Sequence, residues 1–205
     1  MNPGRRRMGE GISGGKAREI TVVSGLPRSG TSMMMQMLEA GGMEVLTDRL
    51  RAADEDNLKG YYEFEKVKEL KHDPSWLDES RGRVVKIVSE LLKYLPAEYP
   101  YKIIFMKRKM EEVLASQHQM LIRRGAVSAD PVGEEKMAGI FQKHLRGVEA
   151  WLARQPNMNV FYADYNKILE HPEHWVERIN RFLEHRLDSK GMVGGVEPAL
   201  YRQRR

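Results

Sequence analysis

The sequence predicts an α/β fold of three layers, in which helices cover both faces of a central parallel sheet. Short β-branched runs alternate with longer segments whose apolar residues recur at helical spacing, a pattern typical of strand–helix–strand units. A glycine-rich loop joins the first of these strands to the first helix. The chain has 205 residues, of which 41% are hydrophobic, and this composition is sufficient for one hydrophobic core.

The predicted strands are short and largely apolar, and the first is rich in β-branched residues. They occupy residues 20–23, 83–88, 101–108 and 159–164. The third run is apolar and then abruptly basic, which places Lys107 and Arg108 at its carboxyl end. Open parallel sheets bind ligands at the carboxyl ends of their strands, so we expect the functional residues to follow the strands.

Helices are predicted where apolar residues recur three and four positions apart. They occupy residues 31–42, 61–71, 89–96, 111–125, 131–154 and 171–185. Glycine or proline ends several of them, as at Gly41, Pro96 and Gly125. The polar segment 47–60 is predicted to be a long connection, and loops of that length are often functional.

One folded domain, residues 19–201, is predicted between a flexible basic arm, 1–18, and a basic tail, 202–205. The arm combines glycine with arginine and has little apolar content. The two ends together hold more positive charge than the whole chain, whose net charge is +5. The domain therefore lacks the basic surface that a nucleic acid requires, and no nucleic-acid partner is expected.

Composition also excludes several chemistries. The chain has no cysteine, which excludes disulfides, cysteine-ligated zinc, iron–sulfur clusters and thiol catalysis. Its apolar runs are too short for a membrane span or a secretory signal, so a cytoplasmic protein without integral membrane association is expected. His171 and His174 have a spacing found in metal sites, but Pro172 lies between them and no third ligand is near, so no metal is expected.

The loop from Gly25 to Gly30 is the strongest local signal for function. It has the glycine spacing of a phosphate-binding loop, but Thr31 replaces the lysine of that motif. Backbone N–H groups of such a loop, together with the amino end of the following helix, converge on an anion. Arg28 restores the positive charge inside the loop. This pattern makes a nucleotide hydrolase less favoured than another anion-binding protein.

The segment Pro27-Arg28-Ser29-Gly30-Thr31-Ser32 resembles the 5′-phosphosulfate loop of sulfotransferases that use 3′-phosphoadenosine-5′-phosphosulfate (PAPS). Its arginine makes it similar to protein-tyrosine sulfotransferases and to many bacterial members. A second resemblance is a strand ending in Arg108 with Ser116 eight residues later, a pair that holds the 3′-phosphate in this family. The resemblance covers about residues 19–201 and implies the phosphate-loop-like sulfotransferase fold.

Three further segments resemble the family. Residues 84–86 are similar to a strand that ends in a lysine near the transferring group, here Lys86. Residues 161–183 resemble the family's late strand, its tyrosine–x–aspartate turn and the helix that follows. Lys190 and Gly191 are similar to a lysine–glycine loop that contacts the 3′-phosphate, although the acidic residue and the tryptophan expected after them are absent.

The resemblance implies transfer of a sulfuryl group from PAPS to a hydroxyl or amine acceptor without a metal. The donor-binding residues that it implies are Arg28, Ser29, Gly30, Thr31, Ser32, Arg108 and Ser116. Arg28 or Lys86 is expected to stabilise the negative charge that develops on the bridging oxygen. Replacing Arg108 is expected chiefly to weaken donor binding, because the 3′-phosphate is remote from the chemistry.

A general base is needed to take the proton of the acceptor, and in several families it is a glutamate beyond the loop. Glu63 is the predicted base, since it follows the long connection and has aromatic neighbours that can desolvate it and raise its pKa. Alternatives that stay open are Glu55, Glu65, His72 and Asp73. Tyr61 and Tyr62 are expected either to contact the acceptor or to pack.

Two other functions remain open at this point. One is a kinase-like phosphate-loop protein, and the other is a nucleotide-binding module that has lost transfer. The composition of the loops does not choose among a small-molecule, sugar or peptide acceptor, and the oligomeric state is equally open.

Overall fold

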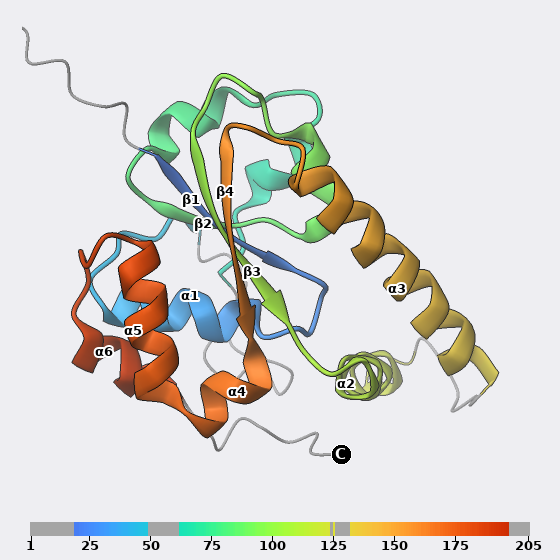
Figure 1. The fold of residues 1–205 in the computed structure, drawn as a ribbon. Coiled ribbons are helices and arrows are strands. Elements are labelled where there is room, and N and C mark those ends of the chain that lie inside the picture. The colour runs from blue at the N-terminus through green and yellow to red at the C-terminus, as the bar shows by residue number, and fades with distance from the viewer. Residues whose placement is uncertain (1–18, 49–61, 124, 126–131, 197–205) are drawn as a thin grey trace, which may run out of the picture.

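The computed structural model describes residues 19–48, 62–123, 125 and 132–196, and within them the chain forms a parallel four-stranded sheet (Figure 1). The strands are β1 (Ile20–Gly25), β2 (Val84–Lys86), β3 (Tyr101–Lys107) and β4 (Met158–Asp164). Their order is β2-β1-β3-β4, and all three pairings are parallel. The predicted arm 1–18, the predicted tail 202–205 and most of the connection 47–60 lie outside the described residues.

Helices cover both faces of this sheet (Figure 1). The α-helices are α1 (Thr31–Ala40), α2 (Met110–Arg123), α3 (Val132–Leu152), α4 (Tyr165–Glu170), α5 (Pro172–Phe182) and α6 (Ser189–Gly194). The 3₁₀ helices are η1 (Glu65–Glu69), η2 (Ser75–Ser80) and η3 (Ser89–Tyr94). No helix in the described part of the chain is both long and apolar enough to cross a bilayer.

The core is divided in two by the sheet, because successive strand side chains point to opposite faces. Val23 and Ile104 belong to one apolar cluster, which packs against α1, α5 and α6. Val22 and Phe105 belong to the other, which packs against the 3₁₀ helices and the carboxyl-terminal half of α3. The predicted three-layer α/β fold is therefore confirmed.

The four predicted strands are all present, but two predicted helices differ. Where the sequence predicts helices over 61–71 and 89–96, the described residues contain the 3₁₀ helices η1 and η3, with bonds three residues apart such as Leu95 N–H to the Leu92 carbonyl. Short helical pieces of this kind often use bonds from residue i to residue i+3. The predicted helix 171–185 ends at Phe182, because Glu184 and His185 adopt positive φ.

The strand order creates a switch point between β1 and β3. β1 leads through α1 to β2 on one side, whereas β3 leads through α2 and α3 to β4 on the other. The chain thus leaves the carboxyl ends of β1 and β3 in opposite directions. In open α/β sheets, ligands bind in the crevice that such a divergence creates.

Candidate donor-binding site

The loop between β1 and α1 holds its shape through its own bonds and a close neighbour. Ser29 bonds the Leu26 carbonyl twice, from its hydroxyl at 2.7 Å and from its backbone N–H at 3.1 Å. Gly30 has φ +95°, and a Cβ there would lie 2.2 Å from a ring carbon of Tyr165. Arg28 has φ +71°, which is unusual and costly for a residue with a side chain.

Arg28 reaches across from the loop to α2. Its Nε donates a hydrogen bond of 2.9 Å to Oγ of Ser116, a residue 88 positions later that is buried. The two segments that the sequence assigns to opposite ends of one donor are therefore in direct contact. Thr31 and Ser32 begin α1 beside this loop, and both are half-buried.

Arg108 follows β3 and contacts the same loop. Its Nη1 donates to the backbone carbonyl of Arg28 at 3.0 Å, and its guanidinium carbon lies 4.4 Å from the centre of the Tyr165 ring. Only 7% of its side chain is exposed. Burial raises the pKa of the Tyr165 phenol, although Arg108 opposes that shift, so this ring is neutral at ordinary pH.

Glu112 and Asn166 complete this network, and the sequence analysis missed both. Nε of Arg108 donates to Glu112 Oε2 at 2.9 Å, and Asn166 Nδ2 donates to Glu112 Oε1 at 2.9 Å. The Asn166 carbonyl oxygen accepts from the backbone N–H of Lys109 at 3.3 Å. The spacing of four residues between Arg108, just before α2, and Glu112 in its first turn is a signal for the first contact. No local pattern indicates the second, which joins residues 54 positions apart.

Lys86 lies at the carboxyl end of β2 and is half-buried. Lys86 is paired with Val23 of β1. The Val23 carbonyl accepts a 3.0 Å hydrogen bond from the backbone N–H of Ile87, the residue after Lys86. Just beyond, the Ser89 hydroxyl lies 2.8 Å from Nε2 of His144 on α3. This bond ties the segment after Lys86 to α3.

Glu63 lies on the outer side of β2, away from β1. Its backbone carbonyl accepts from the Thr47 hydroxyl at 2.9 Å and from the Asp48 N–H at 3.3 Å. These two residues follow Val45, which forms a parallel bridge with Val84 of β2. The structure therefore places the predicted base at the β2 edge, whereas Arg28 lies between β1 and β3.

The alternative bases differ in exposure and charge. Glu65, His72 and Asp73 are all exposed, on η1 or the turns after it. Hydrogen bonds from Ser75 lower the pKa of Asp73, which makes it a weaker base. Glu55, together with Tyr61, lies outside the described residues. Tyr62 is half-buried and donates a 2.6 Å hydrogen bond from its hydroxyl to Glu39 of α1.

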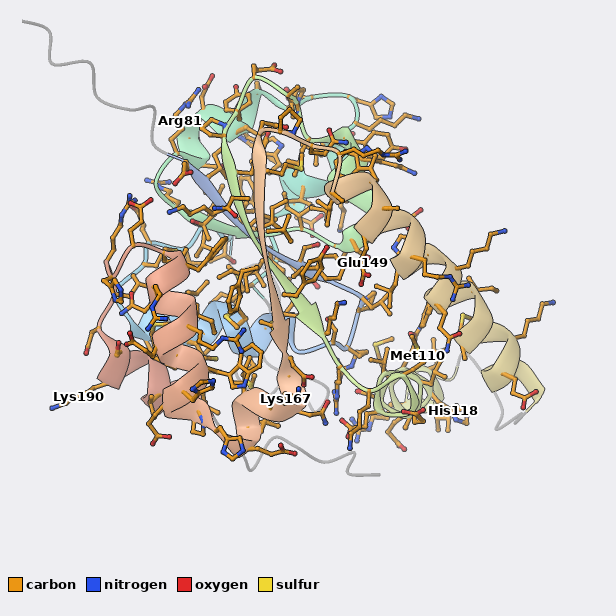
Figure 2. All side chains as sticks on the ribbon, viewed as in Figure 1. Arg81, Met110, His118, Glu149, Lys167 and Lys190 are labelled. Atoms are coloured by element: carbon orange, nitrogen blue, oxygen red, sulfur yellow. The ribbon has the colours of Figure 1, made fainter. Side chains whose placement is uncertain are left out.

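The Lys190–Gly191 segment, which resembles a 3′-phosphate loop in sequence, lies at the carboxyl end of α1. It belongs to α6, and a Cβ on Gly191 would lie 2.2 Å from the carbonyl of Ala40, the last residue of α1. The loop from Gly25 to Gly30 is at the other end of α1, about 15 Å away. Figure 2 shows Lys190 on the opposite side of the molecule from Met110 and His118 of α2.

A parallel sheet with an anion-binding loop at its switch point defines the class of phosphate-loop-like α/β proteins. A family model for the sulfotransferase domain matches residues 18–197. The chain therefore belongs to the sulfotransferase family, as the sequence motifs predicted. No group of three or more side chains suited to holding a metal ion occurs among the residues that the structure describes.

Solved structures of similar fold include a sulfotransferase from Alicyclobacillus acidocaldarius, with a TM-score of 0.50 and 12% identity over 90% of this chain and 89% of that one. A sulfotransferase domain from the curacin biosynthetic pathway has a TM-score of 0.47 and 15% identity over 92% and 79%. An unliganded sugar kinase from Janibacter sp. HTCC2649 has a TM-score of 0.42 and 14% identity over 82% and 95%. A search of the curated proteins found no significant sequence match.

Proposed function

We propose that this sulfotransferase moves a sulfuryl group from PAPS to a hydroxyl or amine of a small-molecule, sugar or peptide acceptor. Family membership supports sulfotransfer in general. The observation that carries the choice of donor is the contact between the two motifs. Arg28 bonds Ser116, and Arg108 bonds the Arg28 carbonyl, so groups suited to both anionic ends of one nucleotide meet at the switch point.

In this proposal the loop amides, the first turn of α1 and Arg28 bind the 5′-phosphosulfate. Arg108 and Ser116 bind the 3′-phosphate. A serine hydroxyl can accept one hydrogen bond and donate another. Ser116 can therefore keep the hydrogen bond from Arg28 while its O–H donates a hydrogen bond to a phosphate oxygen. The two ends of the donor are then held by residues that already contact each other.

The transfer step forms a bond from the acceptor oxygen or nitrogen to sulfur. The bond from sulfur to the bridging oxygen breaks, and its electron pair stays on that oxygen of the released adenosine 3′,5′-bisphosphate. Glu63 takes the proton of the acceptor. Arg28, with Lys86 at the end of β2, stabilises the charge on the leaving oxygen, and the step requires no metal.

Thermal unfolding with ligands tests the choice of donor. A ligand that binds only the folded state stabilises it by about 2.7 kcal/mol at one hundred times its Kd, so even weak binding is visible. We expect adenosine 3′,5′-bisphosphate to raise the Tm without magnesium. Stabilisation only by ATP with magnesium would contradict this proposal and favour a kinase-like protein.

Turnover then separates an enzyme from a binding module. The protein is incubated with PAPS labelled in its sulfate and with a set of alcohols, phenols, sugars, amines and tyrosine peptides. We expect labelled product together with stoichiometric adenosine 3′,5′-bisphosphate. Tight nucleotide binding without product from any acceptor class would favour the module.

A further inference from the structure

Glu112 is a fully buried carboxylate beside the candidate site, with 0% of its side chain exposed. Burying a carboxylate is costly unless each oxygen has a partner and a positive charge lies nearby. Both conditions are met here, because Oε2 accepts from Arg108 and Oε1 accepts from Asn166. An apolar residue would be a simpler choice at this buried position of α2. The presence of a charged residue at this position therefore indicates a role for the Glu112 carboxylate beyond filling space.

The contacts of Glu112 determine how Arg108 is oriented. A guanidinium is planar and rigid, so bonds at two of its nitrogens fix the directions of all its N–H groups. Nε is bonded to Glu112, Nη1 is bonded to the Arg28 carbonyl, and the plane lies over the Tyr165 ring. Asn166 holds the far oxygen of Glu112, and the Lys109 backbone holds Asn166.

The same chain of bonds ends on the strained turn of the loop. Arg28 has φ +71°, a conformation that a non-glycine residue keeps only when its surroundings impose it. The bond from Arg108 to the Arg28 carbonyl and the bond from Arg28 to Ser116 both oppose relaxation of this turn. Arg108 and Ser116 lie on either side of Glu112, at its preceding and following turns.

We propose that Glu112 is a positioning residue, which orients Arg108 and, through Arg108, holds the left-handed turn at Arg28. The loop is thereby set in its anion-binding shape before the donor arrives. The effect on donor binding rests on the proposed function, whereas the effect on the loop itself does not. Two separate measurements therefore distinguish a failure of this inference from a failure of the proposed donor.

Glu112→Gln is the first test, since glutamine has the same shape but only one oxygen. Either Arg108 or Asn166 then loses its acceptor, and the charge facing the guanidinium is removed. We expect hydrogen–deuterium exchange of the ligand-free loop, residues 26–31, to accelerate about tenfold. We also expect the Kd for adenosine 3′,5′-bisphosphate to rise about tenfold. Glu111→Gln, on the exposed neighbouring position, is the matched control and should change neither.

The double variant Glu112→Gln/Asn166→Asp tests the hydrogen-bonding route directly. Glutamine at 112 can accept from Arg108 with its oxygen and donate to an aspartate at 166 with its nitrogen. The pair then has the same total charge and the same number of bonds as the native pair. We expect the loop protection to return to within about threefold of the wild type, with most of the nucleotide affinity restored.

Each result decides the matter. Unchanged loop exchange in Glu112→Gln overturns the inference, as does a double variant of native Tm whose loop stays unprotected. If Glu112→Gln does not fold, a folded double variant with a protected loop supports the inference, and failure of both to fold assigns Glu112 to stability alone and overturns it. If exchange of the loop accelerates in Glu112→Gln but the wild type binds no adenosine 3′,5′-bisphosphate, the inference stands and the proposed donor is overturned.

Discussion

The donor edge, at the ends of β1 and β3, and the β2 edge are built differently. At the donor edge, side chains bond one another directly, as Arg28 does with Ser116 and Arg108 does with Glu112. At the β2 edge, the backbone of Lys86 is held in register with β1, and the backbone carbonyl of Glu63 accepts from the Thr47 hydroxyl and the Asp48 N–H. A preformed site suits a ligand that is the same in every reaction, such as the donor, because its side chains lose little further conformational entropy on binding. In our proposal, donor binding and acceptor activation are therefore assigned to different edges of the sheet.

The largest expected effect comes from Arg28→Ala, which removes the cation at the transferring group. We expect turnover to fall about 10²–10³-fold, measured as labelled product per minute. Arg28→Gly removes the same side chain but accepts φ +71° without strain, so it separates charge from backbone effects. Equal losses in both variants assign the effect to the side chain. A glycine variant with native turnover would remove Arg28 from the chemistry.

Glu63→Gln tests whether the β2 edge contributes the base. Turnover should fall about 10²-fold while the Kd for adenosine 3′,5′-bisphosphate stays within about twofold, since proton transfer is lost and the donor edge is untouched. Glu69→Gln, on an exposed position of η1, is the control. Full activity in Glu63→Gln would move the base to another residue.

Arg108→Ala tests whether the donor edge acts as one unit. From the sequence alone, an effect chiefly on donor binding is expected. The bond to the Arg28 carbonyl changes that expectation, because the loop loses support as well. We expect the Kd for the nucleotide to rise about 30-fold and turnover at saturating PAPS to fall about fivefold. Loss of affinity with unchanged saturated turnover would show that the two motifs act independently.

Gly30→Ala and Gly42→Ala are expected to have the smallest effects, and together they separate steric contact from backbone strain. Both glycines have φ near +95°, but a Cβ meets the Tyr165 ring at residue 30 and nothing within 4 Å at residue 42. Gly42→Ala should lower the free energy of unfolding by about 1 kcal/mol through backbone strain alone. Gly30→Ala should cost about 2 kcal/mol or more, measured by denaturant unfolding. Equal losses of unfolding free energy in the two variants would mean that the Tyr165 ring moves aside without cost.

Most of the fold could be predicted from the sequence because its signals are local. Short apolar runs, with β-branched or aromatic residues, define all four strands, and glycine marks the loop at the first strand–helix junction. The segments that form η1 and η3 were expected to be α-helices, since apolar residues three and four positions apart do not distinguish an α-helix from a 3₁₀ helix. The end of α5 at Phe182 depends on positive φ at Glu184 and His185, which neither residue type announces.

The candidate site divides in the same way. The sequence placed Arg28, Arg108 and Ser116 in one site, and hydrogen bonds join them, while their roles toward the donor stay predictions. The contact of Glu112 with Asn166 escapes detection because it depends on how α2 and α4 meet. The lysine–glycine match at Lys190 contains no information on which end of α1 that segment packs against, and the structure places it near Ala40.

The packing of Gly30 against Tyr165 also determines how late in synthesis the loop can reach its final surroundings. The loop emerges from the ribosome early, but the ring that closes over it arrives 135 residues later, at the junction of β4 and α4. Ser116 and Arg108 reach the loop in the interval. A nascent chain released before that junction would carry the anion-binding motif without the walls that shape it.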